Sequence, residues 1–224
     1  MIKGLLKKDL YNLASYKASL IIIILFCGIA IVGTEAINWG AIIICTITGM
    51  ISLATFNYDE MSDANKYILT LPVTRKEIVM EKYILAIGAT ILGGVLGFLL
   101  TILLANIMQY IRPNDVFNID YESLLSTTIG GMFGISLIQS IQIPSIYKWG
   151  AEKGRIQMFV LIFILIIIGS GLGFLLMKSN LDINMDALKK LFDNLGIIIL
   201  IVSMIAIYYL SYKISYKIYK NKEE

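Results

Sequence analysis

The sequence predicts an all-α, polytopic membrane protein with six transmembrane helices and an N-terminal interfacial helix. Of its 224 residues, 58% are hydrophobic and 16% are charged, whereas soluble domains are about a quarter charged. The apolar residues gather into long charge-free stretches that can cross the roughly 30 Å of hydrocarbon in a bilayer. We therefore expect one transmembrane domain covering residues 1–224.

Six charge-free stretches are the predicted spans: residues 18–34, 36–56, 83–111, 123–147, 156–177 and 195–212. A short hinge around Glu35 and Asn38 separates the first two, which predicts a tight helical hairpin. In a five-span alternative, this hairpin only re-enters the membrane.

The basic residues predict the orientation, because short cytoplasmic connections are enriched in lysine and arginine. With a cytoplasmic N-terminus, 15 of the 19 basic residues fall on the inner side. The other four are Arg112, Lys178, Lys189 and Lys190. A five-span arrangement cannot keep this split, so both termini are predicted to be cytoplasmic. Residues 178–194 then form an extracellular segment with the apolar spacing of an amphipathic helix.

The N-terminal residues 1–17 have the pattern of an amphipathic helix lying in the inner headgroup layer. Leu5 and Leu6 lie on its apolar face, and the lysines lie on another. Asp9 falls within the apolar face, which predicts a basic partner from a cytoplasmic loop. A simple basic anchor is the alternative interpretation.

The longest inner connection, residues 57–82, carries a helix-start signal. Thr74 and Glu77 match a capping box, in which each side chain bonds the backbone N–H of the other residue. Val73 and Ile78 occupy the positions of a hydrophobic staple. A helix should therefore start at Arg75 and run into the third span, and residues 59–69 should form a short helix on the membrane surface. A solvated loop before a capped helix is the plainer alternative.

Small residues are placed for close helix packing at three glycine pairs, Gly93/Gly97, Gly130/Gly134 and Gly169/Gly173. The second span also carries a stripe of small, mildly polar residues, which could pack against a neighbouring helix or line a path. The stripe consists of Ala41, Cys45, Thr48, Ser52 and Thr55.

Several function classes are disfavoured by what the sequence lacks. No Asp, Glu, Lys or Arg lies in the six spans, which argues against an ion-coupled transporter or a pump with its own charge relay. With two cysteines and no histidine, no metal site and no catalytic site are predicted. The glycine-rich run at 169–173 lies mid-membrane and lacks a Gly-Lys-Ser/Thr ending, so it is not a nucleotide-binding loop.

The first inner loop resembles ABC-2-type exporter permeases, the transmembrane subunits of bacterial ABC exporters. The resemblance rests on Phe-Asn-Tyr-Asp-Glu at 56–60 and Tyr-Ile-Leu-Thr-Leu-Pro-Val-Thr-Arg-Lys-Glu-Ile-Val at 67–79. Leu-Lys-Lys-Asp-Leu at 6–10, Tyr-Lys-Trp-Gly at 147–150 and Glu-Lys-Gly-Arg at 152–155 are similar to that family in the same order. The short outer loops depart from larger relatives of that family, so cargo recognition by a large ectodomain is not expected.

The resemblance implies an ABC-2-type exporter fold in which residues 1–17 are an elbow helix and residues 57–82 dock on a separate ATPase. The ATP and Mg²⁺ would be bound by that ATPase, and no cofactor by this chain. The contacts implied with the ATPase are Asp59, Glu60, Lys66, Tyr67, Arg75, Lys76 and Glu77. The second and fifth spans would face the translocation path, which selects Cys45, Thr48, Ser52, Thr55, Gly169 and Gly173.

The resemblance also implies that this chain resides in the bacterial plasma membrane, surrounded by the lipid bilayer. It would pair there with a second permease copy or a sister permease. No nucleic-acid partner is expected. An uncharged path suits an amphipathic or hydrophobic cargo, such as a peptide toxin, an antimicrobial peptide or a lipid-like drug. The rival hypothesis is an integral membrane protein without a transport role, such as an immunity or scaffold protein. A small lipid-modifying enzyme is a more distant third.

Overall fold

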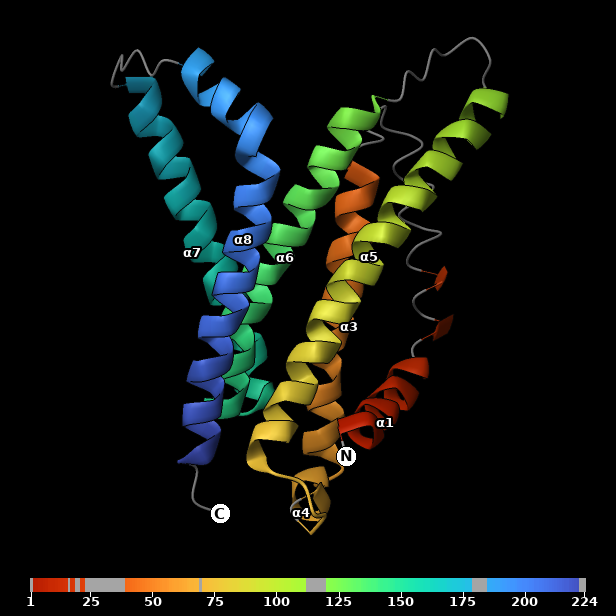
Figure 1. The fold of residues 1–224 in the computed structure, drawn as a ribbon, viewed down its shortest axis with the longest axis vertical. Coiled ribbons are helices and arrows are strands. Elements are labelled where there is room, and N and C mark those ends of the chain that lie inside the picture. Colours follow the sequence, from red (N-terminus) through yellow and green to blue (C-terminus); the bar gives the residue numbers. More distant parts are fainter. Residues whose placement is uncertain are drawn as a thin grey trace.

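A computed structural model describes residues 2–15, 17–18, 21–22, 39–68, 70–111, 120–178 and 185–221. The elements in these ranges are helices (Figure 1), and their order is α1 (Ile2–Ala14), α3 (Trp39–Met61), α4 (Ala64–Ile68), α5 (Arg75–Ile111), α6 (Tyr121–Trp149), α7 (Ala151–Lys178) and α8 (Met185–Lys220). The predicted all-α class is confirmed for this part of the chain.

Four of the described helices are long and apolar enough to cross a membrane, namely Trp39–Met61, Arg75–Ile107, Tyr121–Trp149 and Gly196–Lys220. They correspond to the predicted second, third, fourth and sixth spans. The predicted first span, 18–34, and its hinge lie almost wholly outside the described residues. The predicted fifth span coincides with α7. The number of six spans therefore stays a prediction.

The bundle is built around α3, which packs along both α5 and α6, while α8 packs along α6 (Figure 1). Glycine allows α5 to approach α3 closely. A Cβ atom built on Gly97 would lie 2.7 Å from the carbonyl oxygen of Ala41, and one on Gly93 would lie 2.9 Å from Cβ of Thr48. The close packing predicted at this glycine pair is therefore confirmed.

The pair Gly130/Gly134 does not serve the predicted packing role within the described chain. A Cβ atom on either glycine would meet nothing within 4 Å. The close contact is made by Gly131, where a Cβ would lie 3.3 Å from Cα of Ile42. Successive residues of an α-helix point about 100° apart. A glycine of α6 therefore does make the close contact with α3, but it lies on a different face of the helix from the predicted pair. The surroundings of Gly169 and Gly173 in α7 lie outside what the structure describes.

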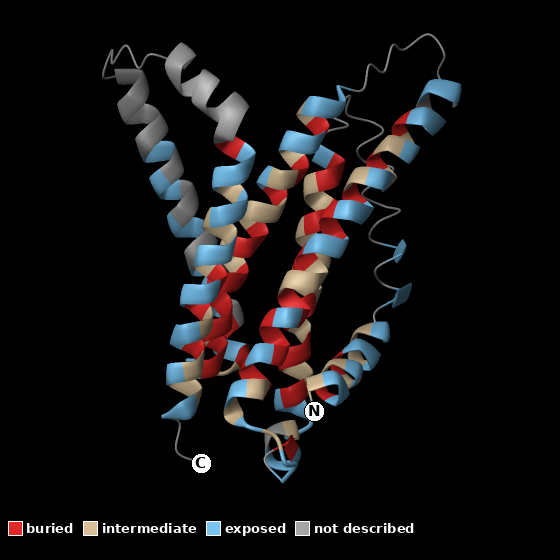
Figure 2. Ribbon diagram, in the orientation of Figure 1, coloured by how far each residue is buried: buried red, intermediate tan, exposed pale blue. Residues whose placement is uncertain are grey.

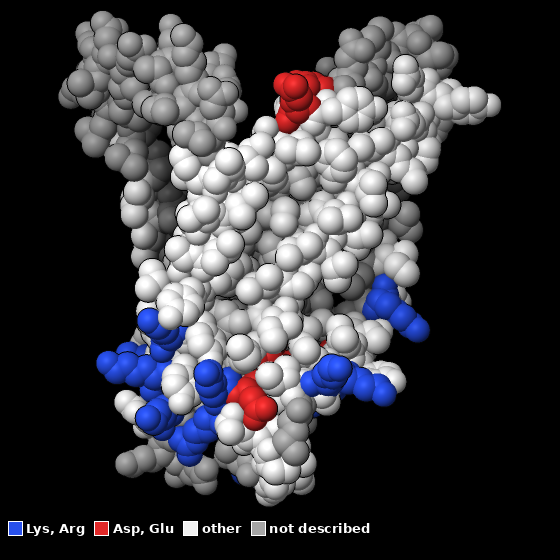
Figure 3. Space-filling model, in the orientation of Figure 1, with Lys and Arg blue, Asp and Glu red and all other residues white. Residues whose placement is uncertain are grey.

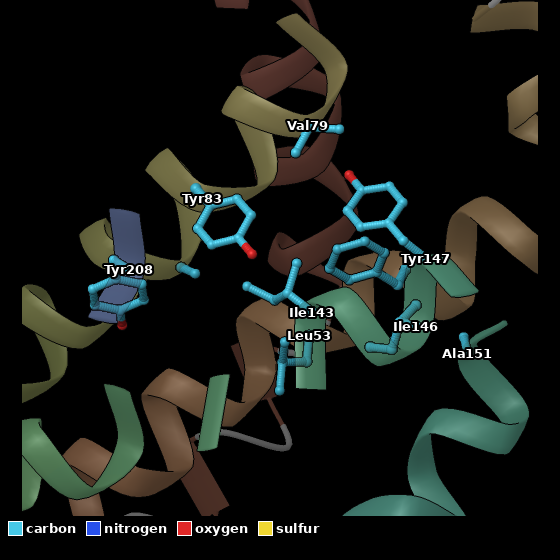
Figure 4. Close-up of a cluster of buried hydrophobic side chains, with 10 residues drawn as sticks. Leu53, Val79, Tyr83, Ile143, Ile146, Tyr147, Ala151 and Tyr208 are labelled. Carbon is cyan, nitrogen blue, oxygen red and sulfur yellow. The ribbon is translucent and has the colours of Figure 1, made fainter. Parts of the chain in front are cut away.

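A cluster of buried side chains joins the lower halves of the helices (Figures 2 and 4). The rings of Phe56 and Tyr147 pack edge to face with centroids 5.4 Å apart. Tyr83 contacts Tyr208 in the same manner at 6.5 Å, and Ala151 at the start of α7 completes the cluster. Aromatic pairs in this geometry add about 0.5–1.5 kcal/mol each beyond their buried area. The cluster therefore ties α3, α5, α6 and α8 together at one end.

The helix ends near this cluster differ from the prediction. The second span was expected to stop at residue 56 and a surface helix to cover 59–69, but α3 continues to Met61 and the short helix α4 covers only Ala64–Ile68. Nothing between Phe56 and Met61 breaks a helix, whereas Asp63 adopts a positive φ of 49°, which aspartate tolerates and which ends the helical path. Asp59 and Glu60 are thus on the last turn of a spanning helix.

The outer segment 178–194 was predicted as an amphipathic helix. Residues from Met185 onward are helical and continuous with the last span as α8, while 179–184 lie outside the described residues. At the opposite end, α4 lies near the start of α1 and the end of α8 (Figure 1), and lysines and arginines gather there (Figure 3). This arrangement agrees with the predicted charge split. Which side of the membrane that end faces remains a prediction.

Candidate functional site

The α4 segment forms an exposed projection from the charged end of the bundle (Figure 1). Met61 is 86% exposed, Tyr67 is 72% exposed, and the nearby Leu71 is also exposed. The ammonium of Lys66 forms a 3.1 Å ion pair with Asp63, and both side chains remain mostly exposed. Large apolar side chains beside charges on a projecting segment are typical of a surface that binds another protein.

The capping box that follows α4 forms as predicted. The backbone N–H of Thr74 donates to Oε2 of Glu77 at 2.9 Å, and the N–H of Glu77 donates to the Thr74 hydroxyl at 3.3 Å. Val73 packs against the cluster that contains Ile78, as the staple requires. The helix begins at Arg75 and runs unbroken into the third span. The end of the projection is therefore fixed relative to α5.

The first turns of α5 anchor α1 through a buried ion cluster. Nζ of Lys82 lies 2.5 Å from Oδ2 of Asp9 and 2.5 Å from Oδ2 of Asp59, and it also donates to the Thr55 hydroxyl. The ammonium of Lys8 bridges the same two carboxylates from α1. Asp9 was predicted to have a basic partner from a loop, and the structure supplies it as Lys82, the last residue of the connection 57–82.

The surroundings of Lys8 favour its charged form. Burial works against the charged ammonium, but hydrogen bonds and Coulomb attraction to Asp59 and Asp9 outweigh it and raise the pKa of Lys8. A cavity of about 220 Å³ adjoins the ion cluster and is also lined by the buried Glu81. Removing one member of such a cluster leaves buried charge without a partner, so α1 is held firmly against α3 and α5.

Glu60 and Arg75 flank the α4 segment, and each binds the end of another helix. Oε2 of Glu60 accepts a 2.6 Å hydrogen bond from the backbone N–H of Ala151, the first residue of α7. Nη1 of Arg75 donates to the carbonyl of Lys220 at 3.0 Å and to that of Tyr219 at 3.4 Å, at the end of α8. Both contacts match the helix dipole, which favours an anion at the N-terminus and a cation at the C-terminus.

The comparison with known families is decisive at this point. The family model described as "ABC-2 family transporter protein" matches residues 4–220, which is nearly the whole chain. The chain belongs to the ABC-2 transporter family. No curated protein and no solved structure matches it. The family assigns the chain to the transmembrane, permease part of an ABC transporter, which confirms the resemblance seen in the first inner loop.

Within this ABC-2 permease, the seven predicted ATPase contacts fall into two groups. Lys66, Tyr67 and Lys76 are exposed on or beside α4. The other four hold a buried charge or a helix end: Asp59 in the ion cluster, Glu77 in the capping box, and Glu60 and Arg75 on the two helix ends. The spacing along the loop could not separate the groups, because it does not show which residues face the bundle.

The predicted path residues of α3 lie in its contacts with α5 and, for Ser52, with Gln139 of α6. Cys45, Ser52 and Thr55 are at most 2% exposed, and Thr48 is partly buried where it faces Gly93. The hydroxyls of Ser52 and Thr55 donate to backbone carbonyls of their own helix. This placement supports the packing alternative for the stripe. Its role in a path, like that of Gly169 and Gly173, stays a prediction.

Sequence reasoning missed a buried polar network that joins α3, α5, α6 and α8. Gln139 of α6 donates from Nε2 to the carbonyl of Gly49 at 2.9 Å, and its Oε1 accepts hydrogen bonds from Tyr208 and Thr90. The hydroxyl of Tyr83 bonds Ser211 and Ser215 of α8. The search for charged residues in the spans passed over these groups, although a glutamine in a predicted span is itself a signal of interhelical bonding.

The rings of these tyrosines also line an apolar cavity of about 630 Å³ between α5, α6 and α8. Because Tyr83 and Tyr208 direct their hydroxyls to partners within the bundle, the cavity is lined almost entirely by hydrocarbon and ring faces. It opens among exposed apolar residues such as Ile91 and Ile205. The charge-free spans predicted an apolar interior in general terms but gave no position for this cavity.

Proposed function

We propose that this chain is the permease subunit of an ATP-driven exporter, whose ATP hydrolysis takes place on a separate ATPase. The proposal rests on the family together with one observation, the exposed α4 projection at the charged end of the bundle. The surface that would bind the ATPase comprises Met61, Lys66, Tyr67, Leu71 and Lys76. ATP and Mg²⁺ would be bound on the partner, and the chain would span the bacterial plasma membrane with α1 as the elbow helix.

Two permease copies would enclose the path, and the cargo would be amphipathic or hydrophobic, such as a peptide toxin, an antimicrobial peptide or a lipid-like drug. Support for this cargo class comes from the described spans, whose middle sections carry uncharged side chains, and from the apolar cavity between α5, α6 and α8. A site for a strongly charged cargo would need groups to replace its hydration, because burying an unpaired charge is costly.

The direct test is affinity purification of the tagged chain from native membranes, followed by mass spectrometry. An ABC ATPase should co-purify with the natural chain and should be lost from a Lys66→Glu, Tyr67→Ala, Lys76→Glu triple variant. Tyr110→Ala is the matched control, because Tyr110 is 91% exposed at the opposite end of α5. Natural chain that purifies without any ATPase would instead favour the rival immunity or scaffold role.

A further inference from the structure

We propose that Glu60 and Arg75 are positioning residues that make the inner ends of α7 and α8 follow the α4 segment, and that neither binds the ATPase. This inference rests on the proposed function, because it assumes an ATPase that moves α4. It reassigns two residues that the family resemblance alone placed on the docking surface.

Glu60 is built into the start of α7. Its carboxylate satisfies the N–H of Ala151, one of the donors that a helix N-terminus leaves without an intrahelical acceptor. Ala151 itself is buried, at 4% exposed. Gly150, with a φ of 90°, makes the approach possible, because a Cβ atom there would sit 3.0 Å from Oε1 of Glu60. The turn between α6 and α7 is thus shaped around this carboxylate.

Arg75 makes the complementary contact at the other side of the projection. It is the first residue of α5, and its guanidinium reaches the last carbonyls of α8. The two residues are separated in sequence only by α4 and its flanking turns. A displacement of α4 therefore pulls on the end of α7 through Glu60 and on the end of α8 through Arg75.

The surrounding anchors decide what else moves with α4. Ile68 of α4 packs with Leu5 of α1 and Ile78 of α5 in one buried cluster, and the Lys82 ion cluster reinforces the contact with α1. The end of α7 is joined to the residues that flank α4 by the Glu60 carboxylate. The end of α8 is joined to them by the Arg75 guanidinium and by Tyr219, which packs against the cluster containing Ile68. The polar contacts of Glu60 and Arg75 can be removed without changing the proposed docking surface, so docking and helix movement can be separated by mutation there.

The experiment uses the full chain with its co-purified ATPase in nanodiscs. One spin label is placed at Thr70, an exposed residue that follows α4 and lies outside the proposed docking surface. Paired with a label at Glu152, in a background without native cysteines, it reports the distance from the projection to the start of α7. Paired with a label at Lys217, it reports the distance to the end of α8. In the natural chain, both distances should stay unchanged when a non-hydrolysable ATP analogue and Mg²⁺ are added. A change in either distance would overturn the proposal without recourse to any mutant.

Variants then separate positioning from docking. Glu60→Ala should retain the ATPase but lose the fixed distance to α7, whereas Glu60→Gln, which keeps an oxygen acceptor, should restore it. Arg75→Ala should likewise broaden the distance to α8 and leave the distance to α7 unchanged, and Arg75→Lys should restore part of the contact. Loss of ATPase binding in folded Glu60→Ala protein, or an unaltered distance in it, would contradict the proposal. Absence of an ATPase from the natural chain would instead refute the proposed function itself.

Discussion

The contact between α3 and α5 in the middle of the bundle and the contacts at its charged end are held together by different physical means. In the middle, α3 and α5 approach each other through Gly93 and Gly97, and contact depends on the absence of side-chain atoms. At the charged end, α1, α3 and α5 meet through the Lys82 ion cluster, and contact depends on paired charges with defined directions. Packing of the first kind tolerates sliding until atoms collide, whereas bonding of the second kind holds one arrangement. The charged end is therefore suited to pass on a displacement.

The strongest test of this comparison is Lys82→Met, which keeps the side-chain length but removes the ammonium. Asp9 and Asp59 would lose their central buried partner, so we expect a loss of about 3–5 kcal/mol in the free energy of unfolding. Denaturant unfolding in detergent micelles measures it. Lys76→Met, at an exposed position on the same helix, is the control and should change little. Equal stabilities of the two variants would show that the cluster is not a structural anchor.

The packing of the middle is tested by a pair of alanine substitutions on α5 with opposite expected signs. Gly97→Ala forces a methyl group against the backbone of Ala41 and should cost about 1–3 kcal/mol. Gly88→Ala meets nothing within 4 Å and should be neutral or stabilise by up to about 1 kcal/mol, because alanine is the better helix former. Thermal unfolding of both variants gives the answer. If Gly97→Ala proved as stable as Gly88→Ala, the close α3–α5 contact would be refuted.

A smaller effect is expected where the projection joins α5. Thr74→Ala removes the hydroxyl that caps the helix and should destabilise the protein by about 1 kcal/mol. Thr74→Ser keeps the hydroxyl and serves as the matched control. Hydrogen exchange of the amides in the first turn of α5 measures the local effect directly. Unchanged protection in Thr74→Ala would mean that tertiary contacts alone fix this helix start.

The smallest effect on stability is expected on the projection itself. Lys66→Ala breaks only the exposed pair with Asp63 and should change the free energy of unfolding by less than about 0.5 kcal/mol. The same change removes one charge from the proposed docking surface. A drop in ATPase co-purification without a drop in stability is therefore expected. A stability loss comparable to that of Lys82→Met would show that α4 belongs to the anchored core and does not present a free surface.

The sequence by itself predicted that this protein lies in a membrane, and it predicted most of the described helices. The features that allowed this are formed by residues close together in the sequence. They are the uninterrupted apolar stretches, the capping box at Thr74, and Asp9 as an acidic residue within the apolar face of its helix. The start of α5 at Arg75 and the presence of a basic partner for Asp9 were therefore predicted correctly, while the identity of that partner, Lys82, came from the structure. The order of short motifs along the chain was also sufficient to indicate the ABC-2 family, which the match over residues 4–220 confirmed.

Only the tertiary structure decided which side of each helix meets a neighbour. Gly131 rather than Gly130 contacts α3, Gln139 is the centre of a buried network, and Glu60 and Arg75 bind helix ends. In lipid, apolar and small residues are acceptable on any face, so hydropathy carries little information about rotation of a helix about its axis. That rotation is set by contacts between segments far apart in sequence, which appear only when the helices are packed together.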